Sequence, residues 1–243
     1  MNTEPTTPPS SLGAASCYAS SCGRVMLYLG DCMDIMPKLG KVDVVITDPP
    51  YPDYHAELYG YRAEDLATLK SLECLQLIFW TAKADFPLDS TAVHIWHKVC
   101  GAACASHYEK IFERNGGKTF RVYPYGSISS PIAAQIVRDV FANHPSQKPI
   151  QLMKRLVCDY TKPGAIVLDP WMGSGSTGVA CVGSDRRFIG IERDPAHYAT
   201  AVERIKRELS QGDLFHSQHN TKDQPPKRSA ASDCSDSMLD DRA

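Results

Sequence analysis

The sequence lacks the features that would place the protein in a membrane or outside the cell. No apolar run approaches the roughly 18 residues of a membrane-spanning helix, and no basic segment followed by an apolar one opens the chain. The nine cysteines include no Cys-x-x-Cys pair, which indicates reduced core thiols rather than a disulfide framework or a zinc site. Cys100 and Cys104 have helical spacing, but such a pair alone does not predict a metal. We therefore expect a cytoplasmic protein without a bound metal.

The chain also has little net charge, a formal -2, which is unusual for a nucleic-acid binder. The distribution is uneven, because the stretch from Lys110 to Arg155 has eight basic residues against Glu113 and Asp139. The basic residues are Lys110, Arg114, Lys118, Arg121, Arg138, Lys148, Lys154 and Arg155. A local excess of this kind favours contact with phosphate, and an ordinary solvated surface is the alternative.

Strand and helix patterns alternate over residues 24–209. The expected strands are Val25–Leu29, 42–47, 92–96, 118–125, 165–168 and 188–192, and the expected helices are 35–39, 64–80, 102–114, Ile150–Tyr160, Ser176–Val182 and 195–209. Strands that are apolar without alternation are typical of a parallel sheet covered on both faces. The pattern predicts one doubly wound, mostly parallel α/β domain. The polar ends, residues 1–23 and 210–243, are expected to be disordered.

The first chemical motif is Asp48-Pro49-Pro50-Tyr51, which closes the apolar run 42–47. It offers a carboxylate, peptide carbonyls and a flat ring, which together fit a planar base that bears an exocyclic amine. A plain turn after a buried strand is the alternative.

The second motif is Asp169-Pro170-Trp171-Met172-Gly173-Ser174-Gly175-Ser176-Thr177, a strand end followed by a glycine-rich turn. With Gly178 it matches G-x-G-x-x-G, and Glu192 follows about twenty residues on, which alone would suggest NAD. However, Asp169 would repel a pyrophosphate and attract the ammonium group of S-adenosylmethionine (SAM). SAM is therefore favoured, with Glu192 accepting ribose hydroxyls. The alternative is a tight strand-to-helix connection without a ligand.

Together with His144-Pro145-Ser146-Gln147-Lys148-Pro149, these motifs resemble the amino-group DNA methyltransferases that act on adenine N6 or cytosine N4. The order, base motif first and cofactor motif last, resembles their beta class, and the resemblance covers residues 24–209. It implies a Rossmann-like SAM methyltransferase fold with a permuted motif order. The cofactor residues that it implies are Asp31, Cys32, Ser146, Gln147, Lys148, Asp169, Pro170, Gly173, Gly175, Ser176, Thr177 and Glu192. For Asp31, an ordinary helix cap is an alternative.

The resemblance further implies methyl transfer to a flipped base in double-stranded DNA, in a bacterial or phage restriction-modification setting. Asp48 and the Pro49 carbonyl would accept the two N–H bonds of the amine, with Pro50 shaping the turn and Tyr51 stacking on the base. The family more often pairs Asp-Pro-Pro-Tyr with adenine N6. Cytosine N4, RNA adenine, an inactive DNA-binding antirestriction protein and a dehydrogenase are the alternatives.

Two segments bear on how nucleic acid would be contacted. Tyr54, Tyr59, Tyr61 and Arg62 either touch nucleic acid near the flipped base or only cap the core. The segment between Tyr125 and His144, where beta-class members usually carry their target-recognition region, is short. Sequence selectivity is therefore expected to be slight, or to depend on a homodimer or another protein.

Just beyond the last expected helix lies the stretch Gln211-Gly212-Asp213-Leu214-Phe215. Gln-x-Asp-Leu-Phe resembles the short peptide by which bacterial DNA-processing proteins dock on the replication sliding clamp. The alternative is that Leu214 and Phe215 fold back onto the domain.

A labelled peptide of residues 210–217 should bind the clamp with a dissociation constant in the micromolar range, since a small apolar anchor must be ordered on binding. A titration followed by fluorescence anisotropy measures this. The same peptide with Leu214→Ala and Phe215→Ala is the control and should not bind. Absence of binding by the unchanged peptide at high micromolar clamp would rule the docking out.

Overall fold

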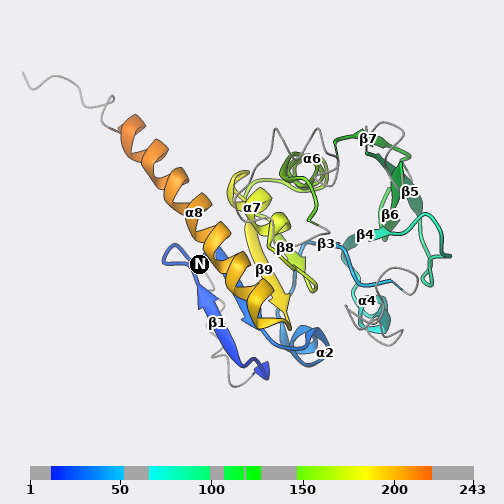
Figure 1. Ribbon diagram of the computed structural model, residues 1–243, viewed down its shortest axis with the longest axis horizontal. Coiled ribbons are helices and arrows are strands. Elements are labelled where there is room, and N and C mark those ends of the chain that lie inside the picture. Colours follow the sequence, from blue (N-terminus) through cyan, green and yellow to red (C-terminus); the bar gives the residue numbers. More distant parts are fainter. Residues whose placement is uncertain (1–11, 52–65, 99–106, 118, 127–146, 221–243) are drawn as a thin grey trace, which may run out of the picture.

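The computed structural model describes residues 12–51, 66–98, 107–117, 119–126 and 147–220 (Figure 1). Nine strands form one sheet in the order β1-β2-β9-β8-β3-β4-β6-β5-β7. The strands are β1 (Ser16–Ala19), β2 (Val25–Leu29), β3 (Val44–Thr47), β4 (Leu75–Trp80), β5 (Ala92–His97), β6 (Tyr108–Arg114), β7 (Val122–Pro124), β8 (Ile166–Asp169) and β9 (Arg187–Glu192). The helices are α2 (Cys32–Ile35), η1 (Met36–Lys38), α4 (Ala67–Lys70), α6 (Ile150–Tyr160), α7 (Ser176–Val182) and α8 (Pro195–Asn220).

The centre of the sheet is parallel. The neighbours β2, β9, β8, β3 and β4 all run the same way, whereas β1 is antiparallel to β2 and β6 is antiparallel to both β4 and β5. The prediction of a mostly parallel α/β sheet is therefore confirmed.

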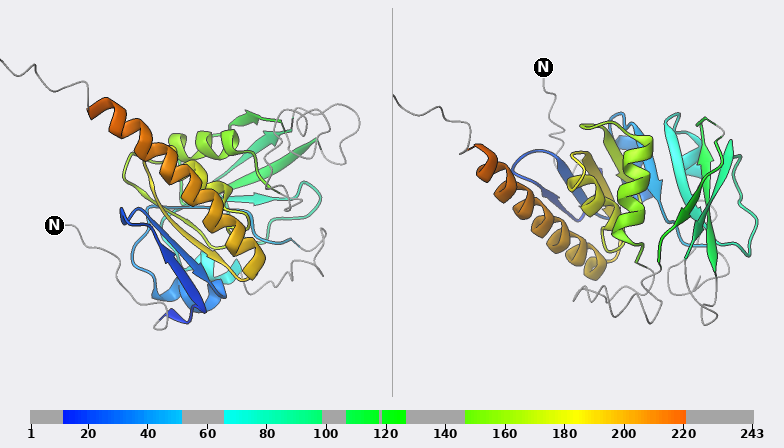
Figure 2. Two further views of the ribbon diagram at one scale, coloured as in Figure 1. Left: turned by 60° about the vertical axis from the view of Figure 1, so that its left-hand side comes forward. Right: turned by 90° about the horizontal axis from the view of Figure 1, so that it is seen from above.

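Helices cover both faces of the sheet, with α6, α7 and α8 on one face and α2 and α4 on the other (Figures 1 and 2). Strand β3 shows why its sequence does not alternate. Val44 and Ile46 belong to the apolar cluster that includes Leu152 of α6, while Val45 belongs to the cluster that includes Ile35 of α2. A strand buried on both faces needs apolar residues at every position.

Two predicted helices are wrong in whole or in part. Within 64–80, only Ala67–Lys70 of the described residues is helical, and Leu75–Trp80 is strand β4. Leucines at helical spacing misled the prediction, because the last of them, Leu75, begins strand β4, whose residues pack into the apolar clusters on both faces of the sheet. Within 102–114, the described residues Tyr108–Arg114 form strand β6 rather than a helix.

The ordered domain extends beyond both predicted ends. Ser16–Ala19, assigned from sequence to a disordered segment, forms the edge strand β1 because it pairs with Met26 to Leu29 of β2. At the other end, helix α8 continues past the predicted end at residue 209 to Asn220. The backbone of Gln211 to Phe215 is thus helical, and clamp docking by this stretch stays a prediction. None of the described helices is both long enough and apolar enough to span a membrane.

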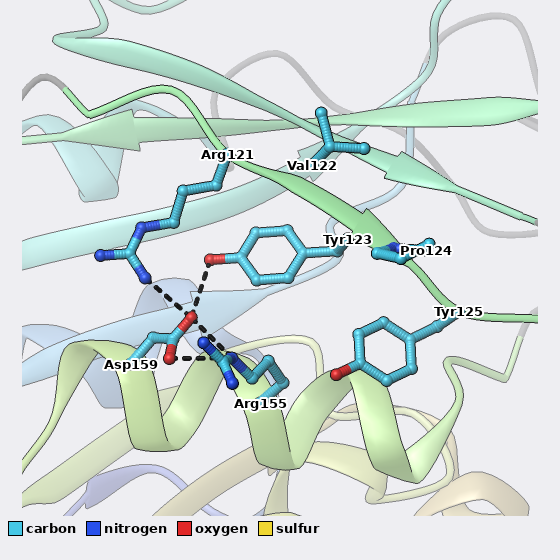
Figure 3. Close-up of a pocket in the computed structure, with 7 residues that line it drawn as sticks. All are labelled: Arg121, Val122, Tyr123, Pro124, Tyr125, Arg155 and Asp159. Carbon is cyan, nitrogen blue, oxygen red and sulfur yellow. Dashed lines mark hydrogen bonds and ion pairs between the residues drawn. The ribbon is translucent and has the colours of Figure 1, made fainter.

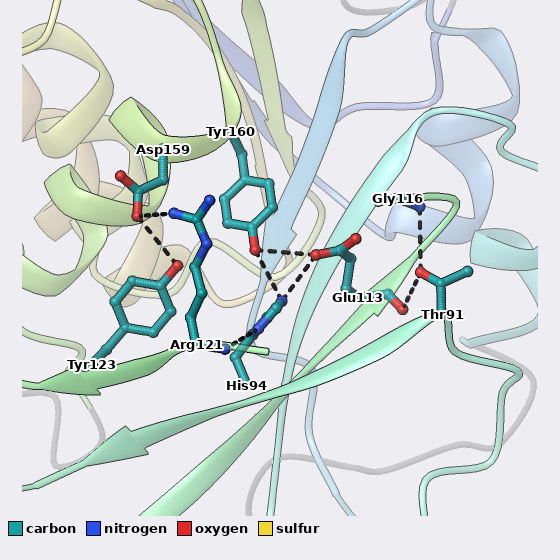
Figure 4. Close-up of polar contacts among 8 residues, drawn as sticks. All are labelled: Thr91, His94, Glu113, Gly116, Arg121, Tyr123, Asp159 and Tyr160. Carbon is teal, nitrogen blue, oxygen red and sulfur yellow. Dashed lines mark hydrogen bonds and ion pairs between the residues drawn. The ribbon is translucent and has the colours of Figure 1, made fainter. Parts of the chain in front are cut away.

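A buried polar network joins strands β5 and β6 to helix α6 (Figure 4). His94 Nδ1 accepts the backbone N–H of Arg121 at 3.2 Å, so the neutral ring carries its proton on Nε2, which lies 2.9 Å from Glu113 Oε2. The Tyr160 hydroxyl donates to the same carboxylate oxygen at 3.0 Å. His94 and Glu113 are both fully buried, and burial lowers the pKa of His94. The native protein therefore keeps this histidine neutral.

The neutral state of His94 predicts a specific loss of stability in acid. Below about pH 6.5 the unfolded chain takes up a proton at this histidine that the native state refuses, so the free energy of unfolding falls as the pH drops. Urea unfolding at about pH 7.5 and about pH 5.5 should show a smaller acid-induced loss for His94→Gln than for the wild type. Other titrating groups are common to both proteins and cancel in the difference. An equal pH dependence in the two proteins would refute the assignment.

Candidate active site

The candidate site lies at the carboxyl ends of the parallel strands. Asp31 follows β2, Glu192 ends β9, Asp169 ends β8 and Asp48 follows β3. Strands β8 and β3 are neighbours, but the chain leaves β8 toward β9 and leaves β3 toward β4. Such a reversal of strand order opens a crevice where open α/β sheets bind their ligands.

Asp169 joins the base motif to the cofactor motif. Its Oδ1 accepts the Thr47 hydroxyl at 2.6 Å and the Trp171 N–H at 3.2 Å, and its Oδ2 accepts the Thr177 hydroxyl at 2.6 Å. Burial raises the pKa of this carboxyl to about 6, against the pull of these donors. Asp169 therefore fixes the end of β3, the end of β8 and the start of α7 relative to one another.

The glycine-rich turn lets two helices pack closely together and also forms part of the crevice. Gly173 and Gly175 have the positive φ angles of 50° and 79° that favour glycine. A Cβ on Gly175 would lie 2.9 Å from the Cβ of Ala201, and one on Gly178 would lie 2.4 Å from Cδ1 of Ile205. Both glycines thus let α7 approach α8. The half-buried Gly173, whose N–H binds Glu192, is the one whose backbone belongs to the crevice.

Glu192 and Asp31 hold the turns on the β9 side. Glu192 Oε2 accepts the Gly173 N–H at 2.9 Å, and its Oε1 accepts the Asp194 N–H at 2.8 Å. Burial raises the pKa of Glu192. Asp31 caps α2 by accepting the Met33 N–H at 2.9 Å, as its alternative interpretation predicts. Cys32 is buried at the start of that helix, so its side chain serves the core.

Two observations bear on a cofactor in this crevice. The buried hydroxyl of Ser176, at the first residue of α7, has no hydrogen-bond partner within the described part of the chain. Ser174 is held through its carbonyl and its hydroxyl by Arg204 of α8, at 2.6 and 2.9 Å, and the Gln147 amide oxygen can accept from the same guanidinium. The unpaired Ser176 hydroxyl, next to a turn that Arg204 holds in place, is suited to hydrogen-bond with a polar ligand.

On the base side, Asp48 and Tyr51 contact each other. The Tyr51 hydroxyl donates to Asp48 Oδ1 at 2.9 Å, and the Tyr51 ring meets the Trp80 ring edge-on with 5.4 Å between centroids. Pro49 is buried and Pro50 is half-buried. The motif is thus a shaped turn whose carboxylate and ring lie on the same side of the crevice.

Lys148 is the residue whose position differs most from expectation. The resemblance places it beside the cofactor, but its ammonium group donates to Asp48 Oδ2 and lies 3.3 Å from Glu109 Oε2. It also lies 5.1 Å from the centre of the Phe79 ring and 5.8 Å from that of Trp96. Burial alone would lower the pKa of Lys148, but Asp48 and Glu109 raise it above its usual range. Lys148 is therefore a permanent cation beside Asp48.

Sequence reasoning assigned no site role to four residues, Thr47, Lys98, Glu109 and Arg204. Glu109 pairs with Lys98 at 2.7 Å and enters the site because the start of β6 lies opposite the end of β5, with Glu109 in register with Trp96. Only a correct prediction of β6 as a strand would have found it. Thr47 carried a signal, since a hydroxyl at the last position of a buried apolar strand needs a partner.

Several residues of the predicted basic stretch form ion pairs with carboxylates of the protein itself. Arg114 is buried and donates to Gln76 Oε1 at 2.8 Å and to the Leu69 carbonyl at 3.0 Å. Arg121 and Arg155 converge on Asp159 in a pocket between β7 and α6, where Val122, Tyr123, Pro124 and Tyr125 complete the lining (Figure 3). The excess positive charge available to phosphate is therefore smaller than the sequence indicates.

Other predicted features fall outside the described residues: Tyr54, Tyr59, Tyr61, Arg62, Ser146 and the Cys100–Cys104 pair. Within the described ranges, no group of three or more His, Cys, Asp or Glu side chains could hold a metal ion.

Comparisons with known proteins identify the family and the fold. Residues 76–203, more than half of the chain, match the N6_N4_Mtase family model, described as DNA methylase. The chain is 28% identical over 215 residues to YubD of Escherichia coli (strain K12), named as a methylase, covering 75% of this chain and 92% of YubD. It is 43% identical over 67 residues to the DNA adenine methyltransferase YhdJ of the same strain, covering 28% of this chain and 23% of YhdJ. The crystal structure of the M1.HpyAVI-SAM complex superposes with a TM-score of 0.54 at 23% identity, covering 74% of this chain and 99% of that one.

The sheet and its flanking helices have the Rossmann-like fold of the methyltransferase in the M1.HpyAVI-SAM complex. The chain belongs to the N6_N4_Mtase family of DNA methylases.

Proposed function

We propose that the protein transfers a methyl group from SAM to the exocyclic N6 amine of a flipped adenine in DNA. The observation that carries the proposal is the hydrogen bond between Thr47 and Asp169, which holds the base motif and the cofactor turn at adjacent strand tips. Two reacting molecules held side by side in a fixed geometry react much faster than free ones.

The cofactor side fits SAM in its chemistry. Glu192 would accept the ribose hydroxyls, the unpaired Ser176 hydroxyl would meet a polar group, and the Gly173 turn would lie against the cofactor. Asp169 lends negative charge to the crevice although its oxygens are already bonded. When bound, SAM supplies an activated methyl group on a positively charged sulfur.

The base side supports attack by a weakly nucleophilic amine. An amine on a base is planar because its lone pair is delocalised into the ring, so it must become tetrahedral in order to react. Asp48, held by Tyr51 through one oxygen and by Lys148 through the other, would accept one N–H bond, and the Pro49 carbonyl would accept the second. Tyr51, backed by Trp80, would stack on the base.

Adenine is favoured over cytosine because the motif is Asp-Pro-Pro-Tyr and because YhdJ is an adenine methyltransferase. Cytosine N4 is the second candidate, since the family model is named for both amines.

The cofactor assignment predicts that Asp169→Ala abolishes SAM binding, because the variant loses the negative charge at the tip of β8 and releases Thr47 and Thr177. Isothermal calorimetry measures this, with thermal unfolding to show that the variant is folded. NADH should not bind the wild type. Tight NADH binding would instead indicate a dehydrogenase.

The base assignment predicts that Asp48→Ala keeps SAM affinity within a few-fold and loses roughly 10²–10³-fold in rate, as expected when a positioned acceptor is removed. The assay is mass analysis of nucleosides from unmethylated DNA and from RNA after incubation with labelled SAM. N6-methyladenine from DNA should be the product. N4-methylcytosine alone would establish the second candidate, and full activity in the variant would refute the base pocket.

A further inference from the structure

Four charged side chains of alternating sign run from the base motif into the sheet. Asp48 pairs with Lys148, Lys148 with Glu109 at 3.3 Å, and Glu109 with Lys98 at 2.7 Å. They come from four separate parts of the chain: the turn after β3, the residues before α6, the start of β6 and the residue after β5. An ion pair that is largely removed from water is costly unless its geometry is good and its other donors are used. We therefore expect this row of ion pairs at the candidate site to have a function.

The position of the Lys148 ammonium group in this row is defined by the side chains around it. Its side chain is only 8% exposed, and the rings of Phe79 and Trp96 flank the ammonium group between the two carboxylates. Its raised pKa means that it carries a proton throughout the ordinary pH range, so it cannot act as the base that removes a proton from the substrate. What it can do is supply positive charge to Asp48.

Asp48 needs such a charge. Burial raises its pKa, Lys148 opposes the rise, and the negative charge of Glu109 adds to it. The Tyr51 hydroxyl also lowers it, and Asp169 is a further acidic neighbour across the β3–β8 boundary. A protonated Asp48 would present an O–H donor where the amine needs an acceptor.

We propose that Lys148 is a positioning residue for methyl transfer, holding Asp48 ionised and oriented toward the amine, and that Glu109 sets the strength of this hold by competing for the same ammonium group. This inference deepens the proposed function and rests on it for its kinetic consequence. It assigns Lys148 to the base side rather than to the cofactor.

The two neighbours of Asp48 should shift its titration in opposite directions. Lys148→Met removes the opposing cation and leaves Glu109 in place, so the pKa of Asp48 should rise by about one unit or more. Glu109→Gln removes a like charge and leaves Lys148 to Asp48 alone, so the pKa of Asp48 should fall. A purely structural role would not produce opposite signs, since both substitutions disturb the same buried row.

The direct experiment is a pH titration of the full chain labelled with ¹³C at the aspartate carboxyl carbons, followed by NMR, with Asp48→Asn used to assign the Asp48 signal. Lys154→Met is the matched control, because Lys154 pairs with Glu208 at 3.5 Å on the side of α6 that faces α8, and it should leave Asp48 unchanged. Lys148→Arg should restore the wild-type titration in part. Shifts of the same sign in Lys148→Met and Glu109→Gln, or no shift in either, would overturn the proposal.

The kinetic experiment separates this inference from the proposed function. The pKa that describes the acid limb of the pH–rate profile should be higher in Lys148→Met and lower in Glu109→Gln. SAM affinity in both variants should stay within a few-fold of wild type. If Lys148→Met loses affinity for SAM, Lys148 belongs to the cofactor site and the inference is refuted. If the wild type methylates no DNA, the proposed function fails, and the NMR titration still decides whether Lys148 holds Asp48 ionised.

Discussion

The structure depends on the burial of one carboxylate at the tip of a central strand of the sheet. Asp169 is almost inaccessible to solvent and has a raised pKa, so it stays charged at neutral pH only with good hydrogen-bond donors around it. Thr47 and Thr177 supply them from the neighbouring strand and from the helix that follows the glycine-rich turn. Because the buried Asp169 carboxylate needs these two donors, the Asp48 turn after β3 and the glycine-rich turn after β8 are held at a fixed distance from each other.

The same logic explains a near-neutral chain in a family that handles DNA. Much of the basic excess between Lys110 and Arg155 is neutralised internally, by Asp89 at Arg114, by Asp159 at Arg121 and Arg155, and by Asp48 and Glu109 at Lys148. Charge counted along a sequence therefore overestimates charge presented to a partner. The internal pairs shape the protein around its site, and attraction to phosphate is left to the charges that remain unpaired.

The sequence predicted the parallel centre of the sheet well, because β2, β3 and β8 are short apolar runs that end at Gly, Asp or Pro, and β9 is a short, mainly apolar run that ends at Glu192. It also predicted Asp48, Asp169 and Glu192 at strand tips, since such positions follow from the strands themselves. It failed at β4 and β6. In β6 the buried Glu113 and Arg114 mask the strand pattern, and their partners His94 and Asp89 lie 19 and 25 residues away in the sequence. The contact between Lys148 and Asp48 spans 100 residues, so no local pattern could reveal it.

Strand β6 runs antiparallel between β4 and β5 and begins beside the site, with Glu109 opposite Trp96. Side chains alternate between the two faces of a sheet, so a slip of one residue in this pairing would turn Glu109 to the other face. Lys110 or Tyr108 would then stand opposite Trp96, and the ammonium group of Lys148 would face a cation or a phenol in place of a carboxylate. The pairing of β5 with β6 in this one register thus decides whether the ammonium group of Lys148 faces a negative charge.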